Sequence, residues 1–470
     1  MNEVGESNAL LGEWSSVPLG DLAEFVTSGS RNWSKYYADE GALFVRTQDI
    51  KHNCLSETGI PRVKLPEKAE GKRTRIHKGD LLITITGYIG RVAAIDKEVE
   101  EAYVSQSVAL VRLRNPEYAK FIQYQLLARR AGVTQLEAMA YGLGRPVLNL
   151  DNIRNAQIKV APLDQQKRIV AEIEKQFSRL DEAVANLKRV KANLKRYKAA
   201  VLKAAVEGRL VETEAERARR EGRSYENGAQ LLQRILETRR SQWQGKGKYK
   251  EPAAPDTTDL PELPEGWVWA ALGQLVWSVK DGPHFSPKYS AEGIPFISGG
   301  NIRPEGIDFS STKFISPKLH EEFSKRCKPE YGDLLYTKGG TTGVARVNTE
   351  TREFNVWVHV AVLKLMDSIE PFYLQHALNS LHCYRQAQKY THGVGNQDLG
   401  LTRMVWITVP LPSSAEQRRI VAEIDRRLSF ICETEVQIDA NLQRAERLRQ
   451  SVLQRAFTAP SVGNASRVTQ

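Results

Sequence analysis

The chain has 470 residues, of which 41% are hydrophobic and 26% charged, which is typical of a soluble protein with several globular domains. It has no apolar run near the roughly 20 residues of a membrane span and no secretory leader at its N-terminus, so we expect a cytoplasmic protein. The net charge of +11 favours a polyanionic partner such as nucleic acid, because basic side chains that neutralise phosphates release condensed counterions.

The first region, residues 1–163, is predicted to be mixed and rich in strands. The segments 41–50 (GALFVRTQDI), 80–87 (DLLITITG) and 104–113 (VSQSVALVRL) combine apolar and β-branched residues, as strands require. A short helix is predicted within residues 116–131, where apolar residues recur three and four positions apart. We therefore expect a globular domain of strands with a few short helices.

A long helix is predicted next, over residues 164–210. Its apolar residues are spaced by mostly three and four positions, from Ile169 to Val201, and neither Gly nor Pro interrupts residues 163–207. About 40 helical residues at roughly 1.5 Å each make a rod about 60 Å long. The stripe is too long for one globular domain to cover, although packing of each helix on its own domain is the alternative.

The rest of the chain repeats the first part after a linker. Residues 211–265 are charge-dense and helical at first and then Pro-rich and extended. Trp14 then matches Trp267, and four further blocks match in the same order at offsets of 251 to 253 residues. We predict a second strand-rich domain over 266–412, a second long helix over 413–459 and a disordered tail over 460–470.

The duplication predicts an α+β protein with two tandem globular domains. The two apolar helix stripes would be buried most simply against each other, as an antiparallel coiled coil that relates the domains by a pseudo-twofold axis. The repeated frames carry different residues, such as TITGYIG against TKGGTTG. Two similar domains with different surfaces, held a fixed distance apart, suit a target with two different half-sites.

The tandem arrangement resembles the specificity (S) subunit of type I restriction–modification systems. The resemblance rests on paired GDLL blocks at Gly79 and Gly332, paired Gly-x-Gly segments at Gly142 and Gly393, and the repeated helix phrase QKRIVAEI and QRRIVAEI. It implies two target-recognition domains, each reading one half of a bipartite DNA sequence. It also implies that the helices set the gap and dock two methyltransferase (modification) subunits, which one or two restriction (translocase and nuclease) subunits join.

No catalytic motif is evident, so we expect a subunit that is not an enzyme. The chain has no GxxxxGK[ST] phosphate loop, no Pro-Pro dipeptide of an adenine-methyltransferase loop, and no HExxH spacing. Its four scattered cysteines predict reduced thiols rather than zinc ligands. We expect no cofactor in this chain, and S-adenosylmethionine, ATP and Mg are implied for the partner subunits. The alternatives are a coiled-coil scaffold with two protein-binding domains and a self-contained modification enzyme.

Candidate DNA-binding residues are the polar and basic side chains on loops that depart from the shared frame, although any one of them could equally be a solvated loop residue. In the first domain they are Arg31, Asn32, Lys35, Arg46, Thr47, Gln48, Thr86, Tyr88, Arg91, Arg145 and Asn149. In the second they are Lys280, His284, Lys288, Ser298, Asn301, Lys338, Thr341, Thr342, Asn396 and Gln397. Five helix residues are predicted to neutralise phosphates between the half-sites: Lys188, Arg189, Lys191, Lys195 and Arg196. No metal site is predicted.

Overall fold

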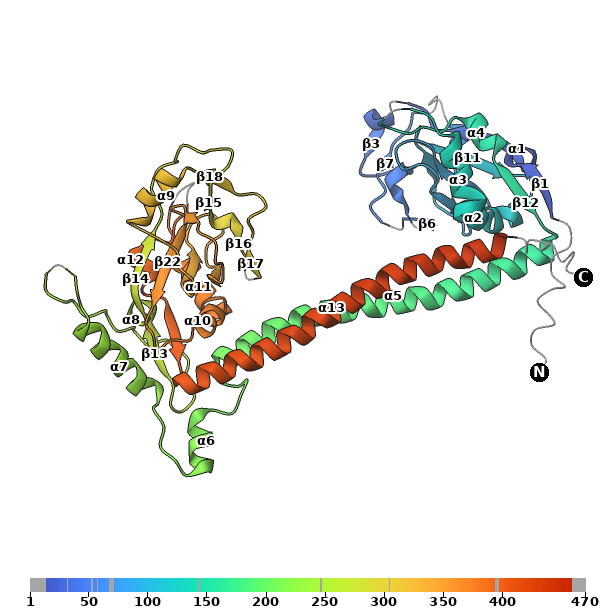
Figure 1. The fold of residues 1–470 in the computed structure, drawn as a ribbon. Helices are drawn as coiled ribbons and strands as arrows, with labels where there is room; N and C mark the ends of the chain where they lie inside the picture. The colour runs from blue at the N-terminus through green and yellow to red at the C-terminus, as the bar shows by residue number, and fades with distance from the viewer. Residues whose placement is uncertain are drawn as a thin grey trace, which may run out of the picture. The chain divides into compact units, whose positions relative to one another are not determined.

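The computed structural model describes residues 14–31, 33–51, 54–56, 58–66, 72–142, 144–245, 247–303, 305–393 and 397–458 (Figure 1). The chain divides into two compact units, Met1–Arg189 with Ile438–Gln470, and Val190–Gln437. Each unit contains one strand-rich domain and stretches of both long helices. We call the strand-rich part before the first long helix domain 1, and the strand-rich part before the second long helix domain 2. The predicted tail, 460–470, lies outside the described residues.

Domain 1 is strand-rich with a few short helices, as the sequence predicts. Its strands are β1 (Ser15–Pro18), β2 (Ala23–Ser28), β3 (Tyr37–Ala38), β4 (Ala42–Val45), β5 (Ile50–Lys51), β6 (Cys54–Leu55), β7 (Arg62–Val63), β8 (Leu81–Thr84), β9 (Val92–Ala94), β10 (Ala102–Val104), β11 (Val108–Leu113) and β12 (Gln157–Val160). Its α-helices are α1 (Leu19–Leu22), α2 (Ala119–Leu127), α3 (Thr134–Met139) and α4 (Leu150–Asn155). The strands form sheets in the orders β2-β11-β8-β9, β10-β4-β7-β3, β1-β12 and β5-β6.

Domain 2 repeats this arrangement. Its strands are β13 (Val268–Ala271), β14 (Val276–Asp281), β15 (Ile294–Ile297), β16 (Ile302–Arg303), β17 (Gly306–Ile307), β18 (Lys313–Ile315), β19 (Leu334–Thr337), β20 (Ala345–Val347), β21 (Asn355–Val356), β22 (Val360–Leu365) and β23 (Thr408–Leu411). Its α-helices are α8 (Leu272–Leu275), α9 (Pro317–Ser324), α10 (Pro371–Leu378), α11 (Leu381–Tyr390) and α12 (Leu401–Met404). The sheet β14-β22-β19-β20 has the strand order of β2-β11-β8-β9.

The central sheet of domain 1 is buried on both faces. Leu81 and Ile83 of β8 pack with Ile122 and Leu126 of α2 on one face, while Leu82 packs with a second cluster on the other. Successive side chains of a strand point to opposite faces, so a strand covered on both sides needs an unbroken apolar run. This explains the LLIT sequence of β8 and the LLYT sequence of β19, every residue of which is buried.

The two long helices are α5 (Leu163–Val206) and α13 (Ser414–Phe457), each of 44 residues. In the first unit Ile173 and Phe177, near the start of α5, pack with Leu453 and Phe457, at the end of α13. In the second unit the end of α5 packs with the start of α13, where Val201 and Ala205 share a core with Ile420 and Ile424. The predicted packing of the two long helices against each other is confirmed, and within each unit they run antiparallel (Figure 1).

The helical part of the linker belongs to the core of the second unit. It forms α6 (Glu214–Glu221) and α7 (Gly228–Ser241), and Leu210, Leu231 and Ile235 are buried with Trp267. A capping box between Thr213 and Glu216 begins α6. The charge-dense linker sequence is therefore not a free tether, because its apolar residues are buried in the core that domain 2 shares with the helices.

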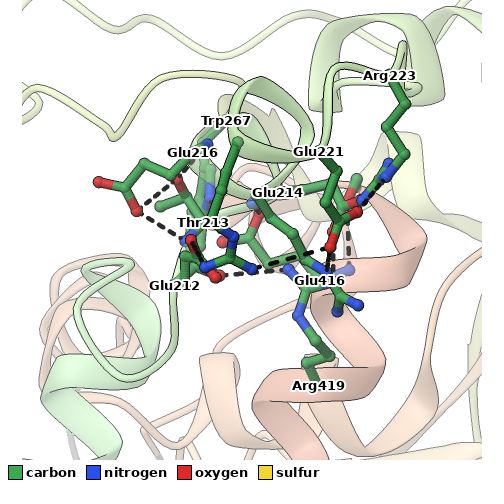
Figure 2. A network of polar contacts seen from close by, with 12 residues as sticks. Glu212, Thr213, Glu214, Glu216, Glu221, Arg223, Trp267, Glu416 and Arg419 are labelled. Carbon is green, nitrogen blue, oxygen red and sulfur yellow. Dashed lines mark hydrogen bonds and ion pairs between the residues drawn. The ribbon is translucent and has the colours of Figure 1, made fainter.

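A buried polar network fixes this linker to α13 (Figure 2). The Glu416 carboxylate, in the first turn of α13, accepts hydrogen bonds from Trp267 Nε1 at 3.0 Å and from the backbone N–H of Glu214 at 2.9 Å. The Glu214 carboxylate in turn accepts from Arg223 and Arg419. Burial raises the pKa of Glu416. Burial also opposes ionisation of Glu214, but the hydrogen bonds from Arg223 and Arg419 outweigh it and lower its pKa.

None of the helices in the described ranges combines the length and the apolar character that crossing a bilayer demands.

Candidate nucleic-acid interface

Three turns meet in domain 1 and form what we call the three-turn site. They are residues 46–49, 85–88 and 105–107. The backbone N–H of Ser105 donates to Val45 O at 2.8 Å, next to the first turn, and the N–H of Ile85 donates to Ser107 O at 3.0 Å. The three turns are far apart in sequence. The turn at residues 105–107, between β10 and β11, bonds to the second turn and to the residue before the first, and so joins them.

Domain 2 has the same backbone arrangement in residues 298–301, 338–341 and 357–359. The N–H of Trp357 donates to Ile297 O at 2.8 Å, and the N–H of Lys338 donates to His359 O at 2.9 Å. Both bonds are the counterparts of those in domain 1 at offsets of 252 and 253 residues. The hydrogen bonds therefore establish the repeat at the site, although the side chains there differ between the domains.

A glycine in each domain makes this close packing possible. A Cβ atom on Gly29 would lie 1.9 Å from Val104 O, and one on Gly282 would lie 1.8 Å from Val356 O. No side chain fits at either distance. The backbone of each glycine, which follows directly after β2 or β14, is therefore in close contact with the backbone that leads into the third turn.

The three-turn site of domain 1 surrounds a cavity of about 430 Å³. Six of the residues predicted from the sequence line it together: Arg46, Thr47, Gln48, Thr86, Tyr88 and Arg145. Sequence reasoning missed Ser30, Ser105, Gln106 and Ser107, which also line it. The polar SQS triplet, which interrupts an apolar stretch between two strands, was the available signal. The cavity combines amide, hydroxyl and guanidinium groups, which are the groups that read base edges.

Two arginines of the predicted set are held by neighbours. Arg46 donates two hydrogen bonds to the Asp49 carboxylate, from Nε at 3.0 Å and from Nη2 at 3.1 Å. These hydrogen bonds raise the pKa of Arg46. The Arg91 guanidinium lies 4.4 Å from the ring centre of Tyr88, whose side chain is 66% exposed, and donates to Ile50 O at 3.3 Å. Both arginines thus fix the shape of the site as well as its charge.

Four of the other predicted residues of domain 1 do not line the cavity: Arg31, Lys35, Arg91 and Asn149. Arg31 and Lys35 are exposed, and Lys35 Nζ lies 4.9 Å from the ring centre of Tyr36. Asn149 caps α4, because its side chain accepts a hydrogen bond from the N–H of Asn152 at 2.7 Å. Asn32 lies outside the described residues.

In domain 2 the structure places the predicted residues in different environments. Lys338 is only 3% exposed, and its Nζ lies 2.7 Å from an Asp398 oxygen and 3.5 Å from an Asp281 oxygen. Ser298 and Asn301 bond to each other at the start of their turn, where the N–H of Ser298 donates to Asn301 Oδ1 at 2.8 Å. Thr342 is buried, and Asn396 lies outside the described residues. The exposed members of the set are Lys280, His284, Lys288, Thr341 and Gln397.

The five basic residues predicted to neutralise phosphates all lie on α5. Lys188, Arg189, Lys195 and Arg196 are exposed, and Lys191 is half-buried. Across the described ranges, no group of three or more His, Cys, Asp or Glu side chains could hold a metal ion.

Comparison with known proteins identifies the family. The family model for the type I restriction modification DNA specificity domain matches residues 12–196 and 264–444, which are the two copies of the repeat. The chain is 22% identical over 421 residues to the type I restriction enzyme EcoBI specificity subunit of Escherichia coli, covering 85% of this chain and 79% of that protein.

Two solved structures share the fold. One comes from work on complex assembly and conformational transition of the type I R-M system, with a TM-score of 0.63 at 19% identity over 95% of this chain and 98% of the other. The HsdS subunit from Thermoanaerobacter tengcongensis gives a TM-score of 0.51 at 19% identity over 94% and 96%. With both copies of the repeat matched by the family model, the chain belongs to the type I restriction–modification DNA specificity family, and it is a non-catalytic specificity subunit with two target-recognition domains.

Proposed function

We propose that each three-turn site reads one half of a bipartite DNA sequence. The observation that carries this proposal is that both domains have the same backbone frame at the site but different side chains on it. Where domain 1 has Thr47, Gln48 and Thr86, domain 2 has Gly299, Gly300 and Gly339. One frame with two sets of side chains suits two similar but unequal half-sites.

In this proposal α5 and α13 set the gap between the half-sites and dock two methyltransferase subunits. Support comes from the length of the helices, since 44 residues at roughly 1.5 Å each reach about 65 Å, more than one turn of DNA at about 34 Å. One or two restriction subunits would complete the assembly. S-adenosylmethionine, ATP and Mg would be bound by these partners, which would carry out base flipping and methyl transfer.

The experiment that tests the proposal maps methylated adenines in the host with and without this gene. We expect one split motif, two short specific sequences with a fixed gap, to lose methylation when the gene is absent. Methylation that is unchanged would contradict the proposal and would fit a scaffold with two protein-binding domains. A motif without a gap would contradict the use of two separate reading sites.

A second prediction concerns the basic residues of α5. Replacing Lys188, Arg189, Lys191, Lys195 and Arg196 with glutamine is expected to weaken binding to all DNA sequences alike, because phosphate contacts carry no sequence information. The slope of log affinity against log salt concentration should become shallower by about 0.9 for each phosphate that is no longer neutralised. The measurement is a salt titration of DNA binding by the complex with its methyltransferase subunits.

The matched control replaces Lys167 and Lys175 of the same helix with glutamine. Each already pairs with an acidic side chain, Lys167 with Glu117 at 3.0 Å and Lys175 with Glu172 at 3.9 Å. The control is expected to leave the slope unchanged. An unchanged slope in the fivefold variant would remove the role proposed for this stretch of α5.

A further inference from the structure

The three-turn site of domain 2 lacks the side chains that line the cavity of domain 1. Its first two turns carry Gly299, Gly300, Gly339 and Gly340 at the positions of Thr47, Gln48, Thr86 and Gly87. Gly299 and Gly339 are close to each other, since a Cβ on Gly299 would lie 3.1 Å from Gly339 O. Gly300 and Gly340 are exposed, so a ligand can approach the backbone of both turns closely.

The third turn of this site, in contrast, carries larger side chains than its counterpart in domain 1. Trp357, Val358 and His359 occupy the positions of Ser105, Gln106 and Ser107, so three small or flexible polar residues become larger and stiffer ones. The rings of Trp357 and His359 pack edge to face with their centres 4.8 Å apart. This contact holds the His359 ring on one side.

Gly339 holds the His359 ring on the other side. A Cβ on Gly339 would lie 2.2 Å from His359 Nδ1, so any larger residue would displace the ring. Nδ1 is buried and has no hydrogen-bond partner in the described part of the chain. A proton on Nδ1 would be a buried donor without an acceptor, so the neutral ring favours the form in which Nδ1 is unprotonated. The proton then resides on Nε2, which becomes a hydrogen-bond donor.

The His359 side chain is half-buried, and no residue in the described ranges bonds to its Nε2 atom. Unlike Nδ1, the Nε2 atom is not fully buried. The nearby cation Lys338, by contrast, is buried and neutralised by Asp281 and Asp398. His359 therefore presents a rigidly oriented donor at the centre of the glycine-lined turns.

We propose that His359 is a specificity-determining residue of domain 2, and that its Nε2–H donates a hydrogen bond to an acceptor on a base edge in the major groove. The acceptors there are purine N7, guanine O6 and thymine O4, whereas cytosine presents a donor. Gly339 is the positioning residue that fixes the ring. This inference rests on the proposed function, because it names the group that reads one base of the half-site assigned to domain 2.

The test uses the complete complex with its methyltransferase subunits. Its affinity is measured for a duplex carrying the methylated motif and for duplexes with single base changes in each half. His359→Leu is expected to lower discrimination about tenfold at one position in one half only. His359→Gln keeps an N–H donor at a similar reach and is expected to retain discrimination.

Two further variants make the test specific. Gly339→Ala is expected to act at the same position as His359→Leu, because the new Cβ displaces the ring while the backbone φ of Gly339 needs no glycine. Ser107→Leu, at the corresponding position of domain 1, is expected to act on the other half. Unchanged discrimination at every position in the His359→Leu complex, or a loss shared by both halves, overturns the proposal. A wild-type motif without two halves would instead overturn the proposed function.

Discussion

Replacing Glu416 with leucine is expected to lower the free energy of unfolding of the second unit by about 3 kcal/mol. The carboxylate is 2% exposed and accepts from both Trp267 Nε1 and the backbone of Glu214. Leucine would leave both donors buried without an acceptor, at about 1–3 kcal/mol each. It would also remove one of the two contacts that join α13 to the start of α6, leaving that between Arg419 and Glu214, so the linker helices should open more readily.

Hydrogen exchange of the backbone amides in the full chain measures this effect residue by residue. The amide of Glu214 and those of α6 should exchange faster in Glu416→Leu, while amides of domain 1 should keep their wild-type rates. Glu416→Gln retains one acceptor oxygen and should show a smaller change. Uniformly unchanged exchange in α6 would show that the network does not hold the linker.

The repeat supplies a matched control in the first unit. Gln165 occupies the position of Glu416, and Trp14 that of Trp267. Trp14 Nε1 is buried but has no hydrogen-bond partner in the described part of the chain, so there is no bond for a substitution to break. Gln165→Leu is therefore expected to cost less than about 1 kcal/mol, the usual range for a change that removes no special contact.

The largest functional effect is expected in the cavity of domain 1. The double variant Gln106→Leu with Arg145→Ala should lower affinity for the methylated motif about 100-fold, since each side chain can make a bidentate contact worth about 1–3 kcal/mol. Gln106 is exposed and lines the cavity, and Arg145 lines it from another loop. Discrimination in the half read by domain 2 should be unchanged.

Binding of the reconstituted complex to duplexes altered in either half checks this prediction. Gln157→Leu is the control, because this exposed glutamine lies on β12 and does not line the cavity. It should bind all duplexes as the wild type does. If the double variant kept full discrimination in both halves, the cavity would not be the reading site of domain 1.

Six of the eleven candidates in domain 1 line one cavity, although the sequence indicates them only as separate loop residues. The remaining five could not be separated from them by residue type. Asn149 and Arg46 are both polar loop residues, but one caps a helix and the other lines the cavity. Which role a side chain takes depends on the neighbours that the fold brings to it, and these are not encoded in the local pattern.

Local features of the sequence determined the elements and their order. Apolar spacing of three and four predicted α5 and α13, apolar and β-branched runs predicted β4, β8 and β11, and the near-constant offset between matching blocks predicted two similar domains. These properties depend on the propensity and periodicity of neighbouring residues, so they can be read without coordinates.

Tertiary structure decided where the three turns meet and what each side chain faces. The site forms because β11 pairs with β8 and β10 pairs with β4, which brings residues 46, 85 and 107 together across long stretches of chain. Lys338 looks like a DNA-binding lysine in the sequence, but two aspartates distant in sequence bury and neutralise it. His359 looks like an ordinary residue between strands, and only its contact with Gly339 shows that its ring is held in place. Such contacts join residues far apart in the chain, and no local pattern reports them.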